Sequence, residues 1–443
     1  MAGAIITPAP GRQRRSRRSR ALFGHGIARR PAVARGALAA TACPCSRFDT
    51  AISFSFASFP LAATSIRRPR IAYLITNSEI GGAQAHVADL IRAMREHADI
   101  TLLAGGDGPL LQVARSTGAN VVQLKSLDNA LSPLRAVQAL RELRAALQQA
   151  APDLLHAHSA KAGALGRVAG RLLNIPVIYT VHGFAFKPAA PWRQRMAARV
   201  TEWLLAPLTS RLICVAKGER ELARALPLAD SRISVIRNGL EDVAQRACPG
   251  GPLRRIAMVA RFARPKRPDV LLDAFGQSGL AECELVIAGE GPQRPAIQAR
   301  AQAMAHVQVE LPGNVHDIPG LLASAQVFVL ISDHEAFPLS VLEAMRAGLP
   351  VIASNLPGIR EQLDDGRCGI LLEDNQPQTV ARALQALGTD APRREALGQL
   401  ARQRWEQQFG LAGMIQSTWS AYQDTLASVP RKQASARQRH AEN

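Results

Sequence analysis

The stretch IAYLITNSEIGGAQAHVADLIRAMREHADITLLAG, residues 71–105, sets the pattern that the rest of the chain repeats. Residues 71–76 form a short apolar run of the length of a buried strand, and residues 100–105 form another. Between them, residues 81–97 carry apolar side chains at intervals of three and four, which predicts a helix with one apolar face: Val87, Leu90, Ile91 and Met94. A strand, a helix and a second strand predict a βαβ unit with parallel strands.

The same alternation extends over most of the 443 residues. Apolar strands follow at VVQLKSL, DLLHAHS, PVIYTVHG, RLICVA and ISVIRNG, and then at RRIAMVAR, ELVIAGEG, VQVELPG, QVFVLIS, PVIASN and GILLE. The helix after VVQLKSL is expected to bury one apolar face: Leu134, Val137, Leu140, Leu143 and Leu147. Strands that alternate with helices predict parallel sheets covered on both faces, so the fold class is α/β.

Proline and glycine divide this series in two. The segment LEDVAQRACPGGPL contains a Pro-Gly-Gly-Pro run, which favours a linker. We therefore predict two doubly wound, Rossmann-like domains, residues 71–240 and 254–410, joined by a linker at residues 241–253 and facing each other across a cleft. Residues 411–427 are expected to form a C-terminal helix and residues 428–443 a disordered tail.

The net charge of +19 is concentrated at the beginning of the chain. Residues 1–70 hold 13 Arg, no Lys and a single acidic residue, Asp49, a net +12. We predict a disordered Arg-rich extension here, or translated sequence upstream of the real start, with a transit peptide as the alternative, because such peptides are Arg-rich and acid-poor. Nucleic-acid binding is an interpretation for this extension alone, since the body is only mildly basic and contains no recognised nucleic-acid motif.

The cysteines match no spacing of a zinc site or a disulfide framework: Cys43, Cys45, Cys214, Cys248, Cys283 and Cys368. This usage is typical of a reduced, cytoplasmic protein. The chain also contains no run of 18 apolar residues, so we expect no membrane-spanning helix.

Polar residues just past strand ends are the candidate site, because ligands of such sheets bind outside the carboxyl ends of the strands. Gly81 and Gly82 open a helix whose N–H groups and dipole suit a phosphate, although a tight turn explains the pair equally well. Arg261 and Lys266 follow the strand RRIAMVA and could together neutralise a diphosphate. The alternative for these two cations is a solvated basic loop.

Two carboxylates in the stretch EAFPLSVLE suit two different contacts. Glu335 precedes Pro338, which is expected to start a helix, and would face the cleft beside a reacting sugar. Glu343 lies about five residues into that helix and could accept hydrogen bonds from a vicinal diol, as in ribose. A cap-region acid and an exposed helical acid are the alternative. A glycosidase pair is a further one, but a hydrolase needs no basic diphosphate site.

The segments GGAQAH, TVHGF, RNG, VARFARPK, AGEGP, EAFPLSVLEAM and GLPVIASNLPGIRE together resemble glycosyltransferase family 4, which has the GT-B fold. The resemblance runs from about Ile71 to Phe409 and is strongest to bacterial enzymes of exopolysaccharide, capsule and lipopolysaccharide biosynthesis. It implies a retaining transferase that moves a sugar from a nucleotide sugar, UDP-linked, to a lipid-linked saccharide acceptor. Such an enzyme would be cytoplasmic and peripheral on the inner face of the cell membrane.

The resemblance also implies roles for residues at matching positions. Arg261 and Lys266 would grip the diphosphate, Glu335 would contact the hydroxyls of the donor sugar, and His182 would lie at that sugar beside the acceptor. The N–H of Gly82 would meet the distal phosphate, Glu343 would bind the ribose, and the stretch from Gly313 would pack the base. The residues that would bind the donor at matching positions are Gly81, Gly82, Asn238, Gly289, Gly313, Val315, Phe337 and Glu343.

Two departures from the family pattern lie in the basic loop. Ala260 stands where the family has Gly before the arginine, and Arg267 stands where it has Gly after the lysine, which adds a charge near the phosphates. The chain contains no Asp-x-Asp triplet, the usual sign of a metal-held diphosphate. We therefore expect transfer without a metal and without a cofactor beyond the nucleotide-sugar co-substrate.

Two further segments have competing interpretations. His156 and His158 lie on one face of a strand end and could bind a metal, but with no third ligand in view we interpret them as cleft-wall residues. The helix in APWRQRMAARVTEWLLAPL mixes arginines with large apolar residues, so it could rest on an anionic membrane. We favour packing of this helix on the core of the first domain.

Two other functions fit the same architecture. A sugar-nucleotide epimerase would consume the donor without an acceptor, and a non-catalytic relative would only bind it. The arginine–lysine pair together with both glutamates favours transfer over these two.

Overall fold

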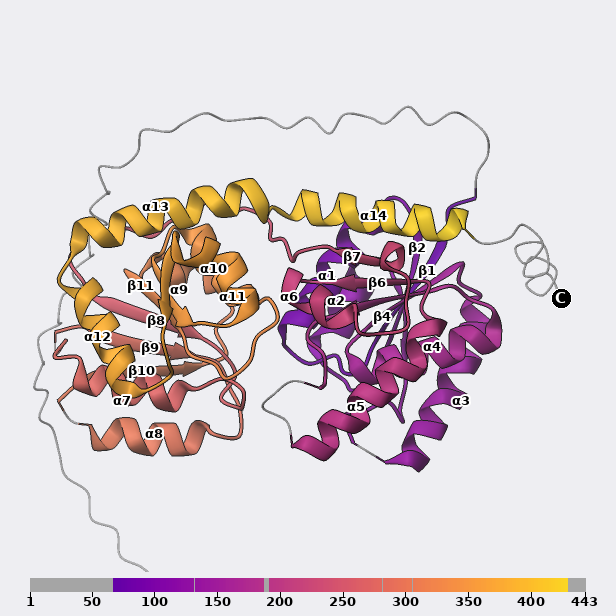
Figure 1. Ribbon diagram of the computed structural model, residues 1–443, viewed down its shortest axis with the longest axis horizontal. Coiled ribbons are helices and arrows are strands. Elements are labelled where there is room, and N and C mark those ends of the chain that lie inside the picture. Colours follow the sequence, from indigo (N-terminus) through magenta and orange to yellow (C-terminus); the bar gives the residue numbers. More distant parts are fainter. Residues whose placement is uncertain (1–66, 131, 187–190, 281, 305, 429–443) are drawn as a thin grey trace, which may run out of the picture. The chain divides into compact units, whose positions relative to one another are not determined.

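The computed structural model describes residues 67–428, except 131, 187–190, 281 and 305. The predictions for the Arg-rich extension and the C-terminal tail fall almost wholly outside the described residues, as do Cys43 and Cys45. The described part contains two parallel sheets with helices on their faces, which confirms the predicted α/β class (Figure 1).

The first sheet has seven parallel strands in the order β3-β2-β1-β4-β5-β6-β7. Its strands are β1 (Arg70–Ile75), β2 (Asp99–Ala104), β3 (Asn120–Gln123), β4 (Leu154–His158), β5 (Val177–Val181), β6 (Arg211–Cys214) and β7 (Ile233–Val235). Its helices are α1 (Gly82–Met94), α2 (Pro109–Ser116), α3 (Pro133–Ala150), α4 (Ala160–Leu173), α5 (Trp192–Leu205) and α6 (Lys217–Ala223), with 3₁₀ turns at Ala206–Leu208 and Asp230–Arg232. β4 and β5 are buried at every position, as parallel strands covered on both faces are.

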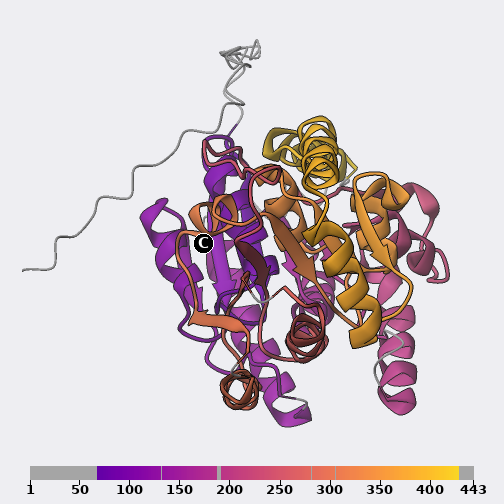
Figure 2. The same ribbon diagram turned by 90° about the vertical axis from the view of Figure 1, so that its left-hand side faces the viewer.

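The second sheet has six parallel strands in the order β10-β9-β8-β11-β12-β13. Its strands are β8 (Arg255–Val259), β9 (Glu284–Ala288), β10 (Gln308–Gly313), β11 (Val327–Leu330), β12 (Val351–Ser354) and β13 (Gly369–Leu372). Its helices are α7 (Pro268–Gln277), α8 (Arg294–Ala303), α9 (Ile318–Ala323), α10 (Leu339–Ala347), α11 (Pro357–Gln362), α12 (Pro377–Gly388) and α13 (Ala391–Gln408), with a 3₁₀ turn at Asp364–Gly366. Helices lie on both sides of this sheet (Figure 2).

In each sheet the strand order reverses beside the first strand of the series. β1 lies between β2 and β4, and β8 lies between β9 and β11. The helices after the two strands at the reversal, β1 and β4 in the first sheet and β8 and β11 in the second, therefore leave toward opposite faces of the sheet. Ligands of doubly wound sheets bind at this reversal. The predicted site segments at Gly81, Arg261 to Lys266 and Glu335 belong to the loops after β1, β8 and β11.

The last helix, α14 (Leu411–Ala427), returns from the second sheet to the first. α13 packs against α10, whereas α14 contributes Met414, Ala421 and Tyr422 to the core cluster of β1 and α1. Where the chain passes back, the backbone of Leu240 bonds to both sides of Gly410, accepting from Leu411 at 2.9 Å and donating to Phe409 at 2.9 Å. The core of the first domain is therefore completed by a helix, α14, that follows the whole second sheet in sequence (Figure 1).

Two predicted helix faces differ from the structure. In α3, Leu143 and Leu147 are buried, but Leu134 is 69% exposed and Val137 47% exposed. A helix of 18 residues is about 27 Å long and a five-residue strand only about 17 Å, so the first turns of α3 extend beyond the sheet. α5 contacts α4 and packs Ala198 against the core of the first domain, but its large apolar side chains are exposed rather than buried there: Trp192, Met196, Val200, Trp203 and Leu204.

Among the helices of the described residues, none combines the length and the apolar character needed to cross a membrane.

Candidate active site

The loops after β8 and β11 bring Lys266 and Glu335 together. The backbone of Lys266 forms an antiparallel bridge with Ser332, which aligns the two loops. The Nζ of Lys266 then lies 2.6 Å from Oε1 of Glu335, with side chains only 17% and 11% exposed. The two opposite charges form an ion pair that is largely shielded from water. Residues 69 positions apart in the sequence thus form one unit at the strand reversal of the second sheet.

Arg261 is exposed and makes no hydrogen bond or ion pair within the part of the chain that the structure describes. The neighbouring Arg267 does not compete with it for a ligand, because Arg267 Nη2 lies 2.9 Å from Asp269 and its Nη1 3.4 Å from Asp333. The extra charge introduced by Arg267 is therefore balanced by two carboxylates. Arg261 remains available as a cation at the end of β8.

Two glycines support the backbone that carries Arg261. Gly289 has φ +141°, and a Cβ there would lie 2.0 Å from the carbonyl oxygen of Ala260, so only glycine fits. The N–H of Gly289 donates to the carbonyl of Gly313 at 2.7 Å, and Gly313 itself has φ +76°. Val315, two residues further on, is half-buried. Both glycines therefore have positive φ angles, which favour glycine at these two positions.

Asn238 and Phe337 fix the loop that holds Glu335. Asn238 follows β7, is buried, and donates from Nδ2 to the carbonyl of Phe337 at 3.1 Å. The Phe337 ring packs edge-on against Phe409 at 5.6 Å between centroids. Pro338 is the N-cap of α10 rather than its first residue. These contacts set the position from which Glu335 reaches Lys266.

Glu343 is the fifth residue of α10 and is half-buried. Burial raises the pKa of its carboxyl; Arg346 opposes this rise and Asp89 of α1 adds to it. Burial likewise raises the pKa of Asp89. The structure therefore places Glu343 near an acid of the first sheet's α1, in a poorly solvated position.

The glycine pair after β1 lies beside the same helix. Gly81 is the N-cap of α1 and Gly82 its first residue, as predicted. A Cβ on Gly82 would lie 3.8 Å from the side chain of Leu339, which begins α10. The first N–H groups of α1 therefore lie next to the start of the helix that carries Glu343.

His182 follows β5 in a loop that approaches Glu335. The next residue, Gly183, has φ +130°, and a Cβ there would lie 3.5 Å from Ala336. Glu219, after β6, accepts a hydrogen bond from the N–H of Phe184 at 3.2 Å and holds this loop, and burial raises its pKa. Sequence reasoning missed Glu219, although its place past a strand end could have singled it out.

The histidines of β4 are core residues rather than parts of a cleft wall, which corrects that interpretation. His156 is fully buried, with Nδ1 2.7 Å from the hydroxyl of Tyr422 and Nε2 2.7 Å from Oγ1 of Thr180. His158 is fully buried too, and its Nδ1 lies 3.1 Å from Nε2 of His182. Burial is the main cause that lowers the pKa of all three imidazoles, which are therefore neutral at pH 7.

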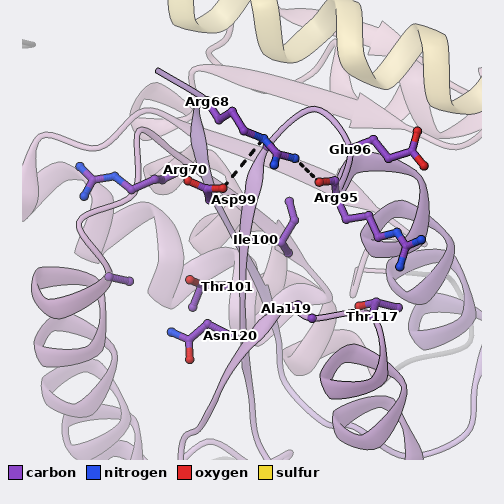
Figure 3. A pocket seen from close by; sticks show the side chains of 13 residues that line it. Arg68, Arg70, Arg95, Glu96, Asp99, Ile100, Thr101, Thr117, Ala119 and Asn120 are labelled. Atoms are coloured by element: carbon purple, nitrogen blue, oxygen red, sulfur yellow. Dashed lines mark hydrogen bonds and ion pairs between the residues drawn. The ribbon is translucent and has the colours of Figure 1, made fainter. Parts of the chain in front are cut away.

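A pocket of about 680 Å³ lies at the amino ends of the strands of the first sheet, opposite the carboxyl ends described above (Figure 3). It is lined by Arg70 and Asp99, the first residues of β1 and β2, and by Arg68 and Arg95. Arg68 lies 4.0 Å from Asp99 and donates to the carbonyl of Arg95. Its place at the amino ends of the strands separates it from the residues described above.

Comparisons with known proteins agree on one family. The model of the glycosyl transferases group 1 matches residues 250–404, and that of Glycosyltransferase Family 4 matches residues 80–242. The UDP-Gal:alpha-D-GlcNAc-diphosphoundecaprenol alpha-1,3-galactosyltransferase of Escherichia coli is 30% identical over 315 residues, which cover 67% of this chain and 81% of that protein. The O-antigen biosynthesis glycosyltransferase WbnH of Escherichia coli is 26% identical over 311 residues, 69% of this chain and 86% of that protein.

Among solved structures, Anabaena HepE in complex with UDP and glucose superimposes with a TM-score of 0.71 at 19% identity. The match covers 82% of this chain and 100% of that chain. At this identity the likeness bears on the fold alone, and it confirms the predicted GT-B fold.

Proposed function

Because the chain belongs to glycosyltransferase family 4, we propose that it moves a sugar, with retention of configuration, from a UDP-linked donor to a lipid-linked saccharide. Its relatives establish that the chain is a glycosyltransferase of polysaccharide or lipid-linked saccharide biosynthesis. The Lys266–Glu335 pair supports the proposal of a donor diphosphate, together with the unpaired Arg261 that follows the same strand, β8. These residues lie at the strand reversal of the second sheet.

The chemistry needs positive charge where the leaving diphosphate develops negative charge. Lys266 has three N–H donors, so it can keep its contact with Glu335 and still donate to a phosphate oxygen. Arg261 offers a planar fork that matches two oxygens of one phosphate. We propose that these two cations and the N–H of Gly82 hold the diphosphate. Because the chain lacks an Asp-x-Asp triplet, we propose that they do so without a metal.

The other residues act around that diphosphate. Glu335, fixed by Lys266, would accept hydrogen bonds from the hydroxyls of the donor sugar, and His182 would contact the sugar from the first sheet. Glu343 would accept hydrogen bonds from the ribose, and the acceptor would attack the face that the diphosphate leaves. A phosphate oxygen of the leaving group then takes the acceptor's proton. Residues 71–240 would thus hold the acceptor and residues 254–410 the donor.

We also propose that the protein works in the cytoplasm, on the inner face of the membrane that carries the acceptor. α5 supports this proposal, because five large apolar side chains on it are 50–68% exposed. Arg193, Arg195 and Arg199 are exposed on the same helix. Apolar side chains mixed with arginines suit the surface of an anionic membrane. The name of the Escherichia coli galactosyltransferase includes a diphosphoundecaprenol-linked acceptor, which fits this location.

A donor screen followed by a transfer assay tests the function. The full-length protein is heated with UDP-, GDP- and ADP-linked sugars, and a UDP-linked sugar is expected to raise its melting temperature most. NMR of that donor with a lipid-linked saccharide should then show transfer with retention. A melting temperature unchanged by every donor, or an epimer formed from the donor alone, would contradict the proposal.

A further inference from the structure

Three histidines from separate elements meet at the carboxyl end of the first sheet. His86 lies within α1, His158 ends β4, and His182 follows β5. One ring nitrogen from each lies within 4.8 Å of the other two. We propose that this histidine cluster binds a divalent transition-metal ion, with Zn²⁺ as the representative.

The spacing of two of these nitrogens already suits one ion. Nδ1 of His158 and Nε2 of His182 are 3.1 Å apart. Tetrahedral zinc with bonds of 2.0–2.1 Å to nitrogen requires about 3.3 Å between neighbouring ligand atoms. The third nitrogen needs to approach by at most about 1.5 Å to complete the same geometry. The ring centroids of His86 and His182 are 4.9 Å apart in an edge-on arrangement, so the third ring already lies beside this pair.

Hydrogen bonding explains His156 but not His158. Both ring nitrogens of His156 have partners at 2.7 Å, as expected of a structural histidine. His158 is equally buried, yet its Nε2 has no hydrogen-bond partner among the described residues. A buried polar atom without a partner costs about 1–3 kcal/mol, and Nδ1 of His86 is a second such atom in the same cluster, so the protein leaves two ring nitrogens of the cluster unpaired.

The chemistry of the cluster selects the class of ion. Neutral imidazole is a ligand for zinc, copper, nickel and iron, whereas Mg²⁺ and Ca²⁺ prefer oxygen. Three protein ligands leave a fourth position open.

The cluster belongs to elements of the first sheet, whereas Arg261 and Lys266 belong to the second, so the ion would not replace these two cations at the diphosphate. The ion would instead bind the ring nitrogen of His182, the residue that would contact the donor sugar in the proposed function. Resting on that function, the ion acts as an inhibitor that competes with the donor, not as a cofactor.

Co²⁺ is the probe, because tetrahedral Co²⁺ absorbs visible light and Zn²⁺ displaces it. The full-length protein, freed of metal with a chelator, is titrated with Co²⁺ in the absence of any donor. We expect one equivalent to bind and Zn²⁺ to abolish the absorption. The measurement needs no sugar, so its failure would leave the proposed function untouched.

Variants make the test specific to the cluster. His86→Ala should weaken Co²⁺ binding at least about tenfold, the least that loss of even an outer-shell partner costs. His86→Cys should restore it, because a thiolate also binds the ion. His97→Ala, which changes an exposed histidine just after α1 and away from the cluster, should bind as the wild type does. Thermal unfolding without metal checks each fold, and His182→Ala replaces His86→Ala if the latter is unfolded. Equal binding by the wild type and the cluster variant, or equal loss in His97→Ala, overturns the site.

Discussion

Lys266 shows how one residue gains its role from its surroundings. Its ion pair with Glu335 is largely shielded from water, so the carboxylate fixes where the ammonium points. Arg267, the next residue, is instead neutralised by two aspartates, which explains why adjacent cations take different roles. Spacing in the sequence predicted that Lys266 and Arg261 serve one ligand; the pairing with Glu335 comes from the bridge between two loops.

Replacing Lys266 tests that role. Lys266→Ala should lower the turnover number by roughly 10²–10³, by analogy with the loss of one oxyanion donor. The measurement is steady-state transfer with a saturating donor. Lys125→Ala, which removes an exposed lysine before α3, is the matched control and should keep normal turnover. Near-normal turnover in Lys266→Ala would refute the assignment.

α5 is the element whose surface differs most from expectation. The side of α5 that faces the protein carries Glu202, whose Oε2 lies 2.8 Å from Nη1 of the buried Arg167. The periodic apolar side chains therefore have no core to enter and face outward. Periodicity predicts that a helix has an apolar face, but it does not say whether protein or lipid covers that face.

Flotation with anionic vesicles tests α5. The protein should lack residues 1–66, because the Arg-rich extension would bind vesicles itself, whereas Arg67 and Arg70 contact Asp153 and should stay. Changing Arg193 and Arg195 to Glu should weaken binding by at least about thirtyfold, since each arginine at an anionic surface contributes about 1 kcal/mol and each glutamate is repelled by that surface.

The matched control for α5 makes the same charge change elsewhere. Arg141 and Arg144 are exposed on α3, and changing both to Glu should leave vesicle binding nearly intact. Equal loss in the two double variants would mean that net charge, not α5, drives binding. Failure of the unaltered protein to float would end the membrane proposal.

At the scale of the whole molecule, the two passages of the chain between the sheets touch each other. Leu240 leaves the first sheet beside Gly410, through which the chain returns. The return lets Tyr422 of α14 contact His156 and donate to the hydroxyl of Tyr73 at 3.0 Å. The last helix thus completes the core beneath the histidine cluster.

A glycine pair tests this crossing. A Cβ at Gly239 would lie 2.6 Å from the carbonyl oxygen of Gly410, so Gly239→Ala should destabilise the protein by about 1–3 kcal/mol through overpacking. Gly413→Ala, inside α14 with open space around it, should instead stabilise by about 0.5–1 kcal/mol. Urea unfolding measures both. Wild-type stability in Gly239→Ala would show that the two passages separate at little cost.

The sequence by itself determined the alternation of strands and helices, because the period of apolar residues is a local property of each segment. It also placed Arg261, Lys266, Glu335 and Gly82 past strand ends, since those loops follow directly from that alternation. Only the tertiary structure decided what each face meets. His86 joins the histidines of two other elements, and Tyr422 reaches His156 across 266 residues. Such contacts depend on which distant segments pack together, and no local period encodes that choice.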